Sequence, residues 1–279
     1  MIAPAITAPT AAKAVTGDNG HAMPAHISAT AARAYLACGL RFWFERVACI
    51  VKPVAAALHL GKSVHAGLRY LHVALWRGGD ASPAAVANAY IEAFDALERD
   101  EGPVAFDGQE ERDRAKGDGL RLLAAYLDSG EVPRERPRGV EVSLEERVPG
   151  LDVPLCGTID LVGHDLRVVD FKTAASRPDP DAAAFDAELQ LVAYAMLVEA
   201  ATGEAPPRME LVHLVKTKVP QVVRVSVPSP NDARKDRAVA MLDAAVTGIA
   251  EGRFNPAPGM QCGWCGYRDE CMRWEGGDP

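Results

Sequence analysis

The sequence predicts an α/β fold in which a helical first third precedes a body of alternating strands and helices. Apolar residues recur at helical spacing through most of residues 28–128. From residue 140 the apolar period shortens to two, which is typical of strands, and helical spacing then returns twice. Alternation of this kind favours a sheet that is covered by helices.

The first elements are predicted to be helices. Ser28 is a suitable N-cap for the first of them, and Pro53 ends that unit because proline is poorly tolerated inside a helix. The expected helices run from Ser28 through Phe44, from Gly61 through Leu75, and over residues 82–99 and 109–128. Residues 1–25 are Ala, Pro, Thr and Gly without an apolar period, so we expect a disordered tail there.

The strands follow the change of period. Gly163, His164 and Asp165 predict a tight turn, which makes the strands on either side of it antiparallel. The expected strands are residues 140–148, 155–162, 166–173, 209–216 and 221–227, with helices over 181–200 and 230–251. From Asn255 onward the sequence is rich in Pro, Gly and Cys, and such a segment holds a fixed structure only if something ties it down.

The formal charge of −8 argues against a protein coated with nucleic acid. The cations are unevenly spread, however. Seven Lys and Arg lie between Ser28 and Arg77 against the single acid Glu45, which permits either a basic face for DNA or an ordinary solvated helix face. No stretch reaches the roughly 20 apolar residues of a membrane span, and the start lacks a signal-peptide pattern. We therefore expect a soluble, cytoplasmic protein with no membrane partner.

Two strands carry a polar face. In the segments LCGTID and VVDFKT, Asp160, Asp170 and Lys172 share one strand parity. If the turn centres on His164, Asp160 lies opposite Val168 and diagonal to Asp170, at roughly 7–8 Å between backbones. A divalent ion can bridge carboxylates across that span.

Two carboxylates and a lysine are the kinds of group that metal-dependent phosphodiester hydrolysis requires. Carboxylates hold Mg²⁺ or Mn²⁺, the ion polarises the phosphate, and a cation stabilises the developing negative charge. Oxygen ligands suit these hard ions rather than zinc. The spacing of these residues alone favours the alternative, an exposed hairpin with ordinary charges. The choice between the two interpretations therefore depends on the other motifs in the sequence.

That context resembles the RecB-like branch of the PD-(D/E)XK nuclease superfamily. Its motifs are G-x-x-D (Gly157 to Asp160), D-x-K (Asp170 to Lys172), Q-x-x-x-Y (Gln190 and Tyr194) and an upstream G-x-x-x-H (Gly61 and His65). They occur in the order of the family over about residues 28–271. Their joint occurrence makes the resemblance specific, although each motif alone is weak.

The resemblance implies a role for each of these residues. Asp160 and Asp170 bind the Mg²⁺ or Mn²⁺ ion, with His65 and the Phe171 carbonyl as further ligands. Lys172 positions the attacking water, while Gln190 and Tyr194 steady the site and the DNA.

Several residues compete for these roles. Glu141, on the preceding strand, is a weaker candidate for the active site. A lone helix histidine is more often packed than a ligand, and His59 and His72 compete with His65. Tyr194 taken alone would be a core aromatic.

The resemblance also implies the fold and the activity. It predicts a restriction-endonuclease-like core, with a central mixed sheet flanked by helices, that hydrolyses phosphodiester bonds at DNA ends. The substrate would be DNA that is single-stranded or has free ends, and a helicase or another recombination protein would be a further partner, in DNA repair, recombination or phage- or CRISPR-related processing. The expected parts are the tail over 1–25, a helical region over 26–130, the nuclease core over 131–254 and a cysteine-rich tail over 255–279. The alternative is a catalytically silent DNA-binding or assembly subunit of a helicase–nuclease complex.

Six cysteines in a protein expected to be intracellular favour metal binding over disulfides. Cys262, Cys265 and Cys271 are one thiol short of a four-thiolate site. Spacing leaves zinc and a 4Fe–4S cluster both open, and zinc would also suit an interaction module with no role in DNA. The resemblance implies the cluster as a structural cofactor, with Cys38 as the fourth ligand and Cys49 in reserve. Cys156 is expected to be a buried free thiol.

Residues 56–63 (AALHLGKS) fit a loose phosphate-loop pattern. Such a loop follows a buried strand and keeps its backbone open. Here an Ala-rich, helix-prone stretch precedes the motif, so we reject the nucleotide-binding interpretation and expect Lys62 near DNA phosphate.

Overall fold

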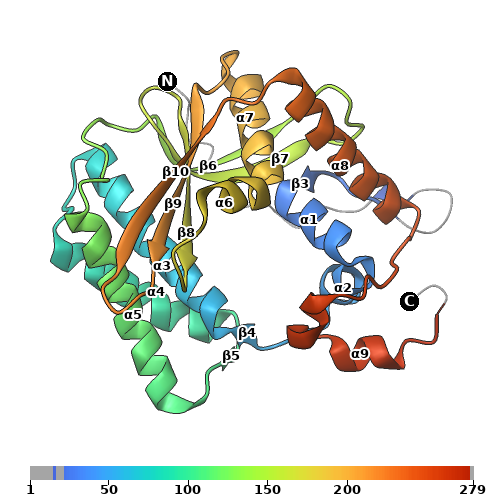
Figure 1. Cartoon of the computed structure of the whole chain (residues 1–279), viewed down its shortest axis with the longest axis horizontal. Coiled ribbons are helices and arrows are strands. Elements are labelled where there is room, and N and C mark those ends of the chain that lie inside the picture. Colours follow the sequence, from blue (N-terminus) through green and yellow to red (C-terminus); the bar gives the residue numbers. More distant parts are fainter. Residues whose placement is uncertain (1–14, 17–21, 277–279) are drawn as a thin grey trace.

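A mixed β-sheet lies between two layers of helices (Figure 1). The computed structural model describes residues 15–16 and 22–276. Its sheet consists of β3 (Ile27–Ser28), β6 (Gly139–Glu146), β7 (Leu155–Val162), β8 (Val168–Ala174), β9 (Arg208–Val215) and β10 (Gln221–Pro228). The α/β prediction with a central mixed sheet is confirmed.

The strand order places β7 and β8 in the middle of the sheet. The path runs β10, β9, β8, β7, with β6 on the other edge of β7. β8 and β9 are parallel, while β6–β7, β7–β8 and β9–β10 are antiparallel. The short strand β3 pairs in parallel with the first residues of β7. β7 therefore has β6 along one edge, and on the other edge β3 at its start and β8 at its end.

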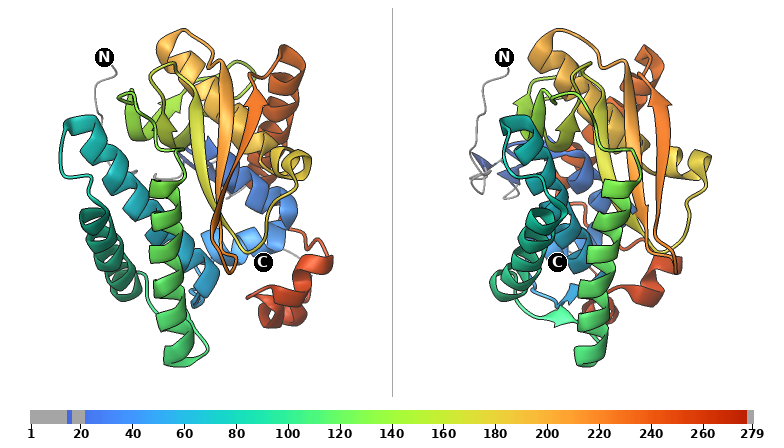
Figure 2. Two further views of the ribbon diagram at one scale, coloured as in Figure 1. Left: turned by 60° about the vertical axis from the view of Figure 1, so that its left-hand side comes forward. Right: turned by 90° about the vertical axis from the view of Figure 1, so that its left-hand side faces the viewer.

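Helices cover both faces of this sheet (Figures 1 and 2). One face is covered by α1 (Ala29–Ala37), α7 (Glu188–Thr202) and α8 (Asp232–Ala250). The other is covered by α3 (Ala56–Arg77) and α5 (Gly108–Asp128), with α4 (Pro83–Asp100) packed against both. The remaining elements are β1 (Val15–Thr16), β2 (Ala22–Met23), α2 (Gly39–Phe42), the π-helix η1 (Trp43–Val47), β4 (Val54–Ala55), β5 (Val104–Ala105), α6 (Pro180–Asp186), the 3₁₀-helix η2 (Met260–Trp264) and α9 (Arg268–Arg273).

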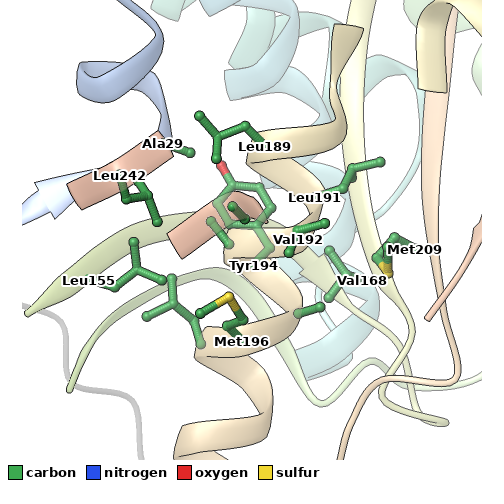
Figure 3. Close-up of a cluster of buried hydrophobic side chains, with 14 of the residues drawn as sticks. Ala29, Leu155, Val168, Leu189, Leu191, Val192, Tyr194, Met196, Met209 and Leu242 are labelled. Atoms are coloured by element: carbon green, nitrogen blue, oxygen red, sulfur yellow. The ribbon is translucent and has the colours of Figure 1, made fainter. Parts of the chain in front are cut away.

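Helix α7 forms the centre of the larger core (Figure 3). Its residues from Leu191 to Val198 are all buried, so the helix is apolar on every side. A helix with that pattern is stable only inside a protein. Here α1, α8 and the sheet enclose it. It is therefore a rigid support for the two polar side chains it carries, Gln190 and Tyr194.

The first predicted helix is interrupted. Cys38 adopts an extended conformation between α1 and α2, with φ −169° and ψ 106°. The C-terminal segment contacts the chain at this point: Leu40 N donates to Asn255 O at 3.1 Å, and a Cβ on Gly39 would stand 3.2 Å from Arg253 O and Asn255 N. The expectation of one helix from Ser28 through Phe44 is wrong because the C-terminal segment packs against this point. Ser28 is the N-cap as predicted, and its Oγ accepts from Ala31 N at 3.1 Å.

Other boundaries also differ. The helix expected from Gly61 begins at Ala56, so residues 56–63 are helical and the rejection of a phosphate loop is confirmed. The helix expected over 181–200 is two helices, α6 and α7, separated at Ala187. Most of the tail predicted over residues 1–25 lies outside the described residues; within it, β1 and β2 pair. In the described part of the chain, no helix is long and apolar enough to cross a membrane.

Candidate active site

The strands β7 and β8 form a fork. They pair at Leu161–Val169 and Val162–Val168, next to the turn, and the described ladder ends there. Beyond these two pairs a side chain bridges the strands: Asp160 Oδ2 accepts a hydrogen bond from Phe171 N at 2.8 Å. The polar side chains of the two strands thus lie where the sheet opens.

The register of this fork differs from the predicted one. The turn spans residues 163–167 and centres on Asp165, with Gly163 N donating to Arg167 O at 2.9 Å. Leu166 takes the left-handed conformation that closes it, with φ 67°. Continued from the paired positions, the register sets Asp160 across from Asp170. The expectation that Asp160 lies opposite Val168 is wrong, and the carboxylates are closer in register than predicted.

Asp170 is a buried carboxylate, only 2% exposed. Its Oδ2 lies 2.8 Å from Lys172 Nζ. Burial raises the pKa of Asp170 to about 6, opposed by the charge of Lys172 and reinforced by Asp160. The protein alone therefore does not fully stabilise the negative charge, and a bound cation would do so.

A hydrogen-bonded chain holds Lys172 in place. Lys172 Nζ donates to Gln190 Oε1 at 2.9 Å, and Gln190 Nε2 donates to Tyr194 OH at 2.9 Å. Tyr194 is buried, and burial raises its pKa, so its hydroxyl stays neutral. Gly157 provides room for this ring, because a Cβ there would lie 3.0 Å from Tyr194 Cε1. The G-x-x-D and Q-x-x-x-Y motifs thus meet.

His65 is the histidine that reaches the carboxylates. It lies on α3, and its Nδ1 is 3.3 Å from Asp160 Oδ1. Burial lowers the pKa of His65, but Asp160 raises it and the net change is upward. The two competitors are engaged elsewhere: His59 packs edge-on against Phe94, and His72 accepts or donates a 3.1 Å hydrogen bond with Tyr126.

Glu141 completes the ring of acids. On β6 it lies between Val140 and Val142, whose partners Leu161 and Ile159 flank Asp160, and its own backbone is left-handed, with φ 46°. A non-glycine residue in that region is strained by about 1–3 kcal/mol and indicates a constraint at a functional site. Its Oε2 pairs with Arg69 Nε at 2.8 Å. Burial raises the pKa of Glu141. The charge of Asp160 raises this pKa further and that of His65 lowers it, so Glu141 interacts electrostatically with both residues.

Residues 26–272 match the family model of the PD-(D/E)XK nuclease superfamily. The chain belongs to this superfamily. Its fold is similar to the crystal structure of a protein from Eubacterium rectale named "Putative exonuclease", with 12% sequence identity, a TM-score of 0.55 and coverage of 91% of this chain and 90% of that chain. The crystal structure of SSO0001 also matches, with 17% identity, a TM-score of 0.37 and coverage of 84% of this chain and 94% of that chain. No curated protein matches the chain.

One residue beside the site of this PD-(D/E)XK protein was not predicted. His213, on β9, is the register partner of Lys172 and is 8% exposed. Burial and the charge of Lys172 lower its pKa, so the ring is neutral. His213 lies beside Lys172 because β8 pairs with β9, and the sequence around His213 does not predict that pairing.

The four cysteines predicted to bind a metal line one cavity of about 320 Å³. Burial raises the pKa of Cys271, and the neighbouring thiols Cys38, Cys262 and Cys265 raise it further, which reflects their proximity. Two backbone N–H groups point at sulfur, Ala257 N to Cys38 at 3.5 Å and Gly259 N to Cys262 at 3.4 Å.

The other two cysteines lie apart from this cavity. Cys49 is exposed and its thiol donates to Arg46 O at 3.7 Å, while Cys156 is on β7, where burial raises its pKa to about 11. Among the residues that the structure describes, no three His, Cys, Asp or Glu side chains are gathered tightly enough for a single metal ion. The four thiols line the cavity described above.

In this PD-(D/E)XK protein, the segment that follows η1 contacts the C-terminal segment beside the cavity. Tyr267 OH donates to Ile50 O at 3.0 Å, and Lys52 pairs with Glu270 at 2.7 Å. Leu40, Phe44 and Tyr267 form a small separate core beneath. The segment after Asn255, expected to need an anchor, is anchored to α2 and η1.

Proposed function

We propose that this protein is a metal-dependent deoxyribonuclease of the RecB-like branch that hydrolyses DNA from its ends. The observation that carries the proposal is the assembly at the β7–β8 fork. Two carboxylates, one imidazole and one lysine held by a hydrogen-bonded Gln–Tyr pair converge from α3, β7, β8 and α7. These four elements supply the groups that phosphodiester hydrolysis requires.

The chemical types of the donor atoms at the fork support Mg²⁺ or Mn²⁺ as the ion. Asp160 and Asp170 would provide carboxylate oxygens, with His65 and the Phe171 carbonyl as further ligands. The raised pKa of Asp170 supports this, because a buried carboxylate without sufficient compensation favours a cation. When bound, the ion would act as a Lewis acid toward the phosphate and lower the pKa of water.

Lys172 is proposed to position the attacking water and to stabilise negative charge on the phosphate. Its ammonium group is shared between Asp170 and Gln190, so it cannot leave the fork without losing both contacts. Gln190 is fixed in turn by Tyr194, whose ring is embedded in the core (Figure 3). This arrangement preorganises a cation on a rigid helix and strand, which is how electrostatic catalysis gains its strength.

Attack at DNA ends is the finer part of the proposal. It is supported by the order of the four motifs, which resembles the RecB-like branch. The Eubacterium rectale protein named "Putative exonuclease" shares the fold, and at 12% identity it supports no more than that.

The test follows degradation of end-labelled linear single-stranded DNA with Mn²⁺ or Mg²⁺, against a closed circle of the same strand. Asp170→Asn should abolish cleavage. Asp165→Asn, the same chemical change in the turn of the same hairpin, should leave it unchanged, since Asp165 pairs with Arg167 at 3.0 Å and not with the fork residues. Digestion of the circle at the linear rate would overturn the dependence on ends. A folded wild type that is inert toward every DNA form would favour the silent DNA-binding or assembly subunit.

We further propose that Cys38, Cys262, Cys265 and Cys271 bind a structural 4Fe–4S cluster. The shared cavity that the four cysteines line supports one common cofactor, and the resemblance to the iron–sulfur members of the RecB-like branch favours a cluster over a tetrahedral zinc ion. The N–H groups aimed at two of the sulfurs suit thiolates of either kind. Anaerobic purification with iron and sulfide analysis decides: about four of each per chain is expected, while one zinc and no sulfide would overturn the cluster.

A further inference from the structure

A groove follows the seam between α3 and α4 and opens on the candidate active site. Two adjoining hollows of about 650 and 350 Å³ form it, and Ala66, Arg69 and Ala93 line both. The larger hollow is also bounded by His65 and Lys172. One continuous depression therefore leads from the catalytic lysine along the outer helical layer, whose helices lie side by side in Figure 2.

The walls of the groove are mostly small and apolar. Apolar side chains come from both helices: Ala57, Leu58, Ala66, Ala93, Ala96 and Leu97. Leu58 is 54% exposed, although it is a large aliphatic residue. At the far end, Tyr70 lines the smaller hollow with a ring that is 37% exposed. Exposed apolar and aromatic surface gathered in a groove marks a binding site.

Positively charged side chains also line this groove. Lys62 and Arg69 line the groove, and each is held by a single partner, Glu101 and Glu141 respectively. Three acids, Asp100, Glu141 and Glu92, also line it, so the groove is not uniformly basic. Exposed ion pairs are weak, and the Arg69 side chain is 59% exposed. Either cation can therefore exchange its carboxylate for a phosphate without a large loss.

We propose that this groove is the track of a single DNA strand that runs from Lys172 past Arg69 to Tyr70. Arg69 binds a backbone phosphate, Tyr70 stacks on a base, and the apolar walls cover the bases between. Cationic and aromatic groups along one groove are the usual means of binding a single strand without sequence preference. Hollows of this size enclose ligands of about nucleotide size. The inference rests on the proposed nuclease function and adds the path of the strand and the residues that hold it.

The first test blocks the groove. Ala93→Trp places an indole in both hollows, and Ala84→Trp, on an exposed position of the same helix outside the groove, is the matched control. Fluorescence anisotropy without added divalent ion measures the affinity for a single-stranded oligonucleotide apart from turnover. Ala93→Trp should weaken binding about tenfold or more, and Ala84→Trp should leave it unchanged, with both variants equally folded by circular dichroism.

The second test assigns Tyr70 to base stacking. Tyr70→Ala should weaken binding of an ordinary strand by roughly 5- to 150-fold, the range that stacking of one base on an aromatic ring contributes. On a strand whose nucleotides are abasic, Tyr70→Ala should have no further effect. Tyr70→Phe keeps the ring and should bind as the wild type. A structural role for Tyr70 would weaken both strands equally and would overturn the assignment.

The outcomes separate this inference from the function it rests on. If the wild type cleaves DNA while Ala93→Trp binds and cleaves normally, the strand path is wrong and the nuclease stands. If no variant cleaves but Ala93→Trp and Tyr70→Ala lose single-strand binding, the path stands and the nuclease proposal falls. Equal affinity of the wild type for blunt duplex and single strand would overturn the strand preference.

Discussion

Replacing Asp170 with asparagine should stabilise the metal-free protein while it destroys activity. The pKa of Asp170 rises from 3.8 to about 6 in the fold, chiefly because of burial. At about 1.4 kcal/mol per pH unit, the ionised side chain costs about 3 kcal/mol of stability at neutral pH. Asparagine has the same shape and no charge, so Asp170→Asn should recover most of that amount.

The pH dependence follows from the sign of this pKa change. Below pH 3.8 the carboxyl is protonated in both the folded and the unfolded chain, and it costs nothing. Between pH 3.8 and about 6 the unfolded chain loses the proton first, so stability falls as pH rises, and above pH 6 the full cost persists. The difference between Asp170→Asn and the wild type should therefore grow over that window and then level off.

Thermal unfolding by circular dichroism, from pH 4 to pH 8, measures the effect. About 3 kcal/mol corresponds to a Tm increase of roughly 6–12 °C for a chain of this size. Mn²⁺ should raise the Tm of the wild type and not that of Asp170→Asn, because ligand binding to the folded state alone is stabilising. Asp165→Asn is the control and should not reproduce the gain. A variant less stable than the wild type at pH 7.5 would refute the reasoning from burial.

Three further variants test other features. Gly157→Ala pushes a methyl group against the Tyr194 ring, so we expect a cost of about 1–3 kcal/mol and a fall in kcat of roughly 10- to 100-fold, measured by thermal unfolding and steady-state cleavage. Tyr126→Phe leaves a buried nitrogen of His72 without its partner and should cost about 1–3 kcal/mol in urea unfolding, with kcat retained. Cys271→Ser should bleach the visible absorbance of the purified protein and lower its Tm by several degrees, because cluster binding and folding are linked.

The parts of the fold that follow from local patterns were predictable. The N-cap at Ser28, the helices α4 and α5 and all five long strands match their expected positions closely. The interruption at Cys38 was not predictable, because it depends on the backbone of residues 253–255, more than 200 positions away. The residues around Cys38 have ordinary helical spacing, and only the packed chain shows the conflict.

For the candidate site, the sequence could nominate residues but could not predict their arrangement. The spacing of Asp160, Asp170 and Lys172 indicated a shared strand face, yet the register shifted because Leu166 adopts a left-handed conformation that its side chain does not signal. Helical spacing alone could not choose His65 over the two other histidines on the same helix, and only the resemblance favoured it. That choice depends on which turn of α3 faces the open end of the fork.

The β7–β8 fork has a geometric consequence. Asp160 and Asp170 are the first positions beyond the last pair of the two strands, so the end of the ladder sets how far apart their backbones lie. The other edge of each strand is held, β7 by β6 and β8 by β9. A substitution that lets the pairing continue past Leu161 and Val169 would therefore narrow the space between the two carboxylates while it leaves every residue of the site in place.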